Sequence, residues 1–418
     1  MAGSHARRRD DVPTPGAGHG HGHGHGDVHV DVGRGPRSAL VGSLVAILVA
    51  VLAGVVLLWP DGSRVDDLAD DLQFAAPGVT FPQAEVLAVQ EPCADARPAQ
   101  GCGQIEVRVA EGDDEGTELL VAVPRDVLGS SLAEGDRVKL IRTPPQADGQ
   151  PATLNYFGIV RTAPLAILAI VFVVVVLAVA RFRGLMALLG LTFAVGVLGW
   201  FMLPALLSGE SAVLIGAVGS AAIMYVVLYT THGFSLRTSA ALAGTMAGIA
   251  VTTVLGVVAV GATRLTGVAD EGSRALSAVA TDLSFPGLFS CAIIVAGLGV
   301  LNDVTITQAS AVWELRAASP RMSRAKVFSS GMRIGRDHIA STIYTIVFAY
   351  AGTALTVLLV LRLYELPTGT LLATEEITQE VVRTLATSIG LVLAVPLTTL
   401  IAVATLPRAV DDDDLEPA

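Results

Sequence analysis

The residues best suited to chemistry lie in one short polar run at the end of a long apolar segment. Asn302, Asp303, Thr305, Thr307 and Gln308 fall within seven positions of each other, directly after a charge-free stretch. On a continuous helix Asp303 and Thr307 share one face, as do Asn302 and Thr305. Carboxylate, amide and hydroxyl oxygens gathered in this way suit a cation or a proton relay. The run therefore predicts a substrate or ion site.

A purely structural role explains the same residues equally well. Asparagine and aspartate are preferred N-cap residues, and either Asn302 or Asp303 would cap a new helix that continues through Trp313 and Glu314. Both interpretations stay open on the sequence.

A second candidate is a run of histidines near the N-terminus. His19, His21, His23 and His25 alternate with glycine, and His29 follows closely. Neutral imidazoles on a flexible chain can gather around zinc, nickel or copper. Glycine alternation supplies no fixed geometry, so the pattern favours weak divalent metal binding, for buffering or sensing, over a structural site. A low-complexity tract with no selected ligand is the equal alternative, and no other cofactor is expected.

Several kinds of catalytic chemistry have no matching motif. The chain has two lysines, Lys139 and Lys326, and neither follows a glycine-rich phosphate loop, which excludes a Walker-type ATPase. Neither a His-Glu-x-x-His pair nor a Gly-x-Ser-x-Gly elbow occurs. His338 stands beside Asp337 at the start of an apolar segment, a pattern typical of a helix start. We expect no enzymatic activity.

The elements that position these residues are long and apolar. Of the 418 residues 52% are apolar and only 16% are charged, against roughly 25% charged in an ordinary soluble domain. Eight charge-free stretches come near the roughly 20 residues that a helix needs to cross a bilayer. They are Ser38 to Pro60, Thr162 to Ala180, Gly184 to Gly209, Ser211 to Thr231, Thr238 to Thr263, Leu283 to Asn302, Ile339 to Leu361 and Thr384 to Pro407. This predicts an α-helical polytopic membrane protein of about eight transmembrane helices.

The arginines predict its orientation. They lie before the first stretch, between the second and third, between the fourth and fifth, between the sixth and seventh, and after the eighth. The positive-inside rule then places both termini in the cytoplasm. The expected organisation is a disordered tail (1–37), a signal-anchor helix (38–60), an outer domain (61–161), a seven-helix core (162–408) and an acidic cytoplasmic tail (409–418). A cleaved signal peptide is disfavoured because the first apolar run exceeds the usual h-region and ends in Leu-Leu-Trp-Pro.

The segment 61–161 predicts a small extracytoplasmic β-barrel-like domain. Five short runs have β character: Ala84 to Gln90, Gln104 to Ala110, Glu118 to Pro124, Asp136 to Arg142 and Asn155 to Thr162. So small a domain suggests an oligonucleotide-fold or SH3-like barrel. Eighteen acidic and eight basic side chains argue against nucleic-acid binding. Cys93 and Cys102 flank a loop on the oxidising side, which favours a disulfide, whereas Cys291 lies in an apolar stretch as a packing residue.

Three motifs resemble the YibE/F family of multispanning bacterial membrane proteins. They are GLGVLNDVTITQASAVWEL (297–315), DHIAST (337–342) and SIGLVLAVPLT (388–398). The likeness spans roughly Tyr156 to Pro407. It implies a helical bundle in the bacterial plasma membrane and an undetermined activity that is often assumed to be transport.

Two functions compete on the sequence. The first is a permease or ion-coupled carrier for a small solute or ion, with a site at Asn302, Asp303, Thr305 and Thr307. The alternative is a non-transporting sensor or assembly scaffold, which uses the outer domain and the basic segment from Arg316 to Arg336. The lipid bilayer is the one partner that the sequence identifies, and a protein partner is not indicated.

Overall fold

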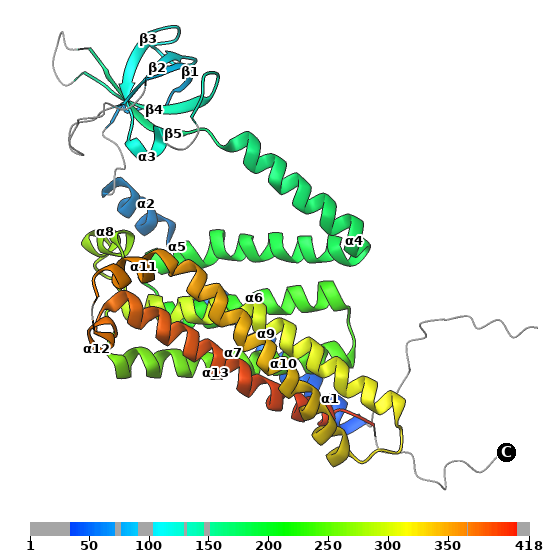
Figure 1. Cartoon of the computed structure of the whole chain (residues 1–418). Helices are drawn as coiled ribbons and strands as arrows, with labels where there is room; N and C mark the ends of the chain where they lie inside the picture. The colour runs from blue at the N-terminus through cyan, green and yellow to red at the C-terminus, as the bar shows by residue number, and fades with distance from the viewer. Residues whose placement is uncertain are drawn as a thin grey trace, which may run out of the picture.

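The computed structural model describes residues 34–71, 77–90, 103–128, 132–145, 151–365 and 367–407. The histidine tract, Cys93, Cys102 and the acidic tail lie outside these residues, so the predicted metal binding and disulfide stay predictions. Figure 1 shows a bundle of long helices at one end of the molecule and a small sheet at the other.

The sheet has five antiparallel strands, as the alternating runs predict. They are β1 Gln83–Val89, β2 Gln104–Val109, β3 Glu118–Ala122, β4 Arg137–Thr143 and β5 Thr153–Ile159, in the order β3-β2-β1-β4-β5. In β2, Ile105, Val107 and Val109 alternate inward and pack against Val86 and Leu140. The edge strands β3 and β5 approach each other, so the sheet curls around this core.

The helices form the larger part of the chain. They are α1 Arg34–Leu57, α2 Gly62–Asp71, α3 Arg125–Leu128, α4 Thr162–Val197, the π-helix η1 Leu198–Met202, α5 Leu203–Leu207, α6 Ala212–His232, α7 Leu236–Thr263, α8 Glu271–Val279, α9 Phe285–Ala318, α10 Arg324–Thr353, α11 Leu355–Leu363, α12 Thr368–Leu371 and α13 Glu375–Ala404. Capping side chains mark where two of these helices begin. The hydroxyls of Ser235 and Ser284 accept hydrogen bonds from backbone amides in the first turns of α7 and α9.

The number of membrane-length helices differs from the eight predicted. Six helices in the described ranges are long and apolar enough to cross a membrane, or seven if α10 and α11, bent by 63°, count as one. The remaining difference of one span arises at residues Thr162–Leu207. They count as one long apolar helix in the structure, whereas the sequence predicts two spans separated at residues 181–183. The break is present: Arg181 has a non-helical φ of 53° and ψ of −129°, and the two limbs of α4 diverge there in Figure 1.

The bundle is built around three helices. α7, α9 and α13 pack closely against one another, α10 covers α9 and α13, and α6 lies against α7, α9, α4 and α1. We call the end that holds α8, α12 and the start of α13 the sheet end. The opposite end, with the α6–α7 turn and the α9–α10 connection, is the basic end. The first limb of α4 joins the sheet to the bundle.

Candidate functional site

Oxygen-bearing side chains are buried in the contact between α7, α9 and α13. They are at most 2% exposed, and we call them the polar seam: Thr245 and Thr252 of α7, Thr305 and Gln308 of α9, and Thr387, Thr398 and Thr399 of α13. Burying a polar group in apolar surroundings costs free energy unless it is hydrogen-bonded. A seam residue whose polar atoms are all hydrogen-bonded within the protein is explained by a structural role. A seam residue with an unpaired polar atom is not.

Towards the basic end the seam is well bonded. The Gln308 amide donates to the Gly331 carbonyl (2.9 Å) and to Thr399 Oγ1 (2.7 Å), which joins α9, α10 and α13. Thr245 Oγ1 and Thr305 Oγ1 share a hydrogen bond of 2.6 Å between α7 and α9. These side chains fix the register of four helices.

Other seam oxygens have no hydrogen-bond partner among the described residues. Among them are Thr252 Oγ1 and Thr398 Oγ1, and the nearby Asn302 Oδ1 is also buried and unpaired. Each such group costs about 1–3 kcal/mol. The missing hydrogen bonds distinguish Thr252, Thr398 and Asn302 from the bonded residues of the seam.

Glycines stand opposite the two unpaired threonines. A Cβ added to Gly244 would lie 2.2 Å from Thr398 Oγ1, and one added to Gly390 would lie 2.2 Å from Thr252 Oγ1. The hydroxyls of Thr398 and Thr252 therefore contact the backbone of the neighbouring helix, α7 and α13 respectively. Between the two levels Leu301 fills the seam, since a Cβ on Gly248 would lie 2.9 Å from its Cδ2 atom. Leu301 separates the basic-end part of the seam from the part around Thr252.

A half-buried ion pair covers the seam at the sheet end. Arg383 donates to Glu380 at 2.7 Å on α13. The guanidinium carbon also lies 5.2 Å from the centre of the Phe289 ring of α9 and 6.0 Å from that of Tyr350 of α10. Nearby, Glu375 accepts from the backbone amides of Thr266 and Gly267, at 2.8 and 3.0 Å. This end of α13 is thus tied to α9, α10 and the α7–α8 connection.

The structure divides the residues that the sequence groups together. Thr305 and Gln308 are buried in the seam, and Asn302 lies beside it. Asp303 is exposed on another face of α9, and the Thr307 hydroxyl donates to its backbone carbonyl at 2.7 Å. The five side chains therefore do not converge on one stripe. The role of Asp303 in ion binding stays a prediction.

The alternative role of Asn302 or Asp303 as a helix cap is wrong. Both residues lie in the middle of α9, which runs without a break from Phe285 to Ala318 and is capped by Ser284. Neither residue therefore stands at a helix start.

A metal centre built from protein side chains has no counterpart in the described ranges. No three His, Cys, Asp or Glu side chains are grouped there to hold a metal ion.

The candidate site predicted from the sequence leaves out the seam residues of α7 and α13 and the Arg383–Glu380 pair. Their signal is the spacing of small and hydroxyl residues: Gly244 and Thr245 stand about two helical turns before Thr252, and Gly390 about two turns before Thr398. Such spacing places small and hydroxyl groups on one helix face, as in close helix packing within membranes.

Long apolar helices packed around buried polar groups fit the class of helical membrane proteins. The chain belongs to the YibE/F-like family, whose family model matches residues 168–408. This confirms the resemblance seen in the three motifs and places the whole seam inside the matched region. No curated protein and no solved structure matches the chain.

Proposed function

We propose that this protein is a permease for a small polar solute or ion, and that the solute passes along the polar seam between α7, α9 and α13. The observation that carries the proposal is the unpaired, buried oxygens of Thr252, Thr398 and Asn302. A solute that sheds water on entering the bundle needs such groups to replace its hydration. The seam holds hydroxyls and amides and no carboxylate, so the lining suits a neutral polar solute or a weakly held cation.

The proposed path would be closed at two levels. Leu301 fills the middle of the seam, and the Arg383–Glu380 pair, held between Phe289 and Tyr350, covers the sheet end. Transport on this basis needs α13 to move away from α7. The glycines opposite Thr398 and Thr252 favour such a movement, because the helices meet there without interlocking side chains.

The test asks whether water reaches the seam. Thr398→Cys, in a chain with Cys93 and Cys102 replaced by serine, should react with a water-soluble methanethiosulfonate reagent in proteoliposomes. Cys291 is buried on the side of α9 that packs against Gly216 of α6, away from the seam. It is the matched control and should stay unmodified in the same chain without Thr398→Cys. Uptake by the same vesicles of a panel of cations and small neutral solutes would then identify what passes.

Equal protection of Cys291 and of the cysteine introduced at position 398, together with no uptake of any solute in the panel, would contradict the permease. The sensor or scaffold function would then be favoured.

We also propose a plasma-membrane location with both chain ends in the cytoplasm. The basic end holds most of the arginines of the bundle, and the positive-inside rule places that end in the cytoplasm. Glu115 lies in the exposed β2–β3 turn and Ala325 in the exposed first turn of α10. A single cysteine at position 115 should react with an impermeant maleimide in intact cells, and one at position 325 only after the cells are opened. The reverse labelling pattern would invert the topology.

A further inference from the structure

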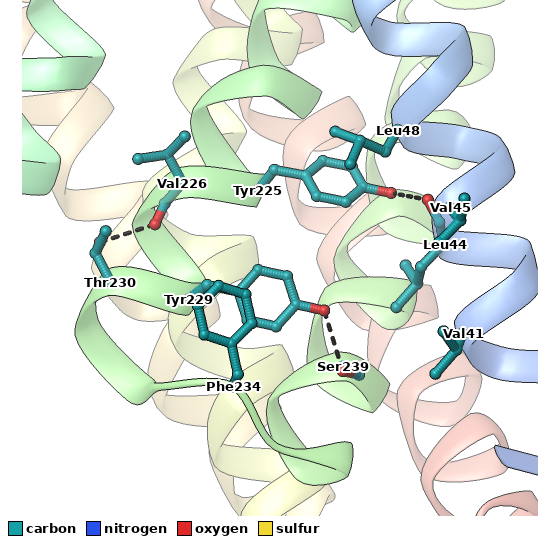
Figure 2. Close-up of a pocket in the computed structure, with 10 residues that line it drawn as sticks. All are labelled: Val41, Leu44, Val45, Leu48, Tyr225, Val226, Tyr229, Thr230, Phe234 and Ser239. Carbon is teal, nitrogen blue, oxygen red and sulfur yellow. Dashed lines mark hydrogen bonds between the residues drawn. The ribbon is translucent and has the colours of Figure 1, made fainter.

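A groove of about 440 Å³ lies between α1, α6 and the start of α7, away from the polar seam. Figure 2 shows α1 on one side, with Val41, Val45 and Leu48, and the rings of Tyr229 and Phe234 on the other. Val45 is 53% exposed and Phe234 88% exposed. The stacked rings of Tyr229 and Phe234, with centres 4.5 Å apart, form the wall nearest the basic end.

The polar atoms of the groove are already paired within the protein. Tyr225 donates its hydroxyl to the Leu44 carbonyl (2.7 Å), and the hydroxyls of Tyr229 and Ser239 bond to each other (3.0 Å). Thr230 donates to the carbonyl of Val226 in its own helix (2.8 Å). The groove thus offers hydrocarbon contact and no free hydrogen-bonding group from these side chains. The chemistry of this part of the groove matches an apolar group.

The mouth of the groove at the basic end carries positive charge. Arg37 lies one helical turn before Val41, on the same face of α1. Arg183 and Arg237 both lie close enough to His232, at the end of α6, for their charges to act on it. The carboxylate of Glu314 is 4.0 Å from Arg237, the outer limit of an ion pair, and both side chains are exposed. Arg37 and Arg237 therefore lie on helices that line the groove, and Arg183 lies within electrostatic range of the end of α6.

We propose that this groove binds one acyl chain of an anionic phospholipid, whose phosphate is held by Arg37, Arg183 and Arg237. The apolar face of a helix from a second copy would leave the positive charge at the basic end of the groove without an anion, whereas an anionic lipid supplies one. Apolar contact along α1 and positive charge at one end match the two parts of such a lipid. The bound lipid would join α1, which lies outside the family match, to α6 of the matched bundle.

The experiment compares lipid retention by the purified full chain. The protein is delipidated in detergent, given equal amounts of phosphatidylglycerol and phosphatidylcholine with identical acyl chains, and examined by native mass spectrometry. We expect one phosphatidylglycerol to be retained in preference to phosphatidylcholine. Val45→Trp fills the groove and should abolish retention. Ala50→Trp is the matched control: it lies on the opposite side of α1, is exposed, and should retain the lipid.

Two further variants and one control separate the parts of the proposal. Arg37→Gln should lower the preference for phosphatidylglycerol about fivefold, whereas Arg362→Gln, exposed at the other end of the bundle, should not change it. Phe234→Ala removes one wall and should weaken retention of both lipids without unfolding the chain, because its side chain is exposed. Equal retention by Val45→Trp and Ala50→Trp would overturn the groove as the site. Equal retention of the two lipids by the unaltered chain would overturn the preference for an anionic headgroup.

Discussion

Gly390→Ala is expected to destabilise the protein by about 1–3 kcal/mol, as overpacking of a closed core does. An alanine in a helix is otherwise favoured over glycine by about 1 kcal/mol. The contact with α7 makes the net change in stability unfavourable, because the new Cβ would lie 2.2 Å from Thr252 Oγ1. Thermal unfolding in detergent would measure the change. The control is Gly261→Ala on α7, where nothing lies within 4 Å of the added Cβ and no loss of stability is expected.

A double-mutant cycle tests the contact itself. Thr252→Ala removes the offending oxygen, and the next Thr252 atom from the added Cβ is then its own Cβ at 3.3 Å. Gly390→Ala combined with Thr252→Ala should therefore recover most of the stability that Gly390→Ala loses, with a coupling energy of about 1 kcal/mol or more. If the two effects simply add, α7 and α13 do not meet at this level, and the seam as described is wrong.

The sheet and the extents of the helices can be predicted from sequence for a simple physical reason. Each strand has one buried face, so Ile105, Val107 and Val109 alternate with polar residues and show both the strand and its inner side. Long charge-free runs likewise indicate membrane-length helices, and the charged residues at 181–183 indicate the break that Arg181 makes in α4.

The faces of the bundle helices could not be predicted in the same way. A helix that is apolar all round shows little amphipathic pattern, so its sequence does not say which side meets a neighbour. Thr252 and Thr253 are adjacent in α7, yet the Thr252 hydroxyl lies unpaired in the seam while that of Thr253 donates to Ile249 of its own helix. The same limit explains why the sequence places Asp303 and Thr305 in one candidate site. Only the packing of α9 shows that one is exposed and the other buried.

Thr252→Val and Thr398→Val are expected to stabilise the protein and to impair its function. Valine keeps nearly the shape of threonine and removes a buried hydroxyl that has no partner among the described residues. Relieving that desolvation cost should raise stability by about 1–2 kcal/mol at each site. Thr253→Val is the matched control on α7. Its hydroxyl is already bonded at 2.8 Å, so its loss should bring no such gain.

The functional readout is water access to the seam. In the Thr398→Cys chain, adding Thr252→Val should slow modification by the methanethiosulfonate reagent, because a row of oxygens that hydrates the open path has been interrupted. Adding Thr253→Val should leave the rate unchanged. Higher stability combined with slower modification would mean that the unpaired hydroxyls are kept at the expense of stability because the open state uses them. Higher stability with an unchanged rate would mean that Thr252 takes no part in an open path, and the permease would lose the observation on which it rests.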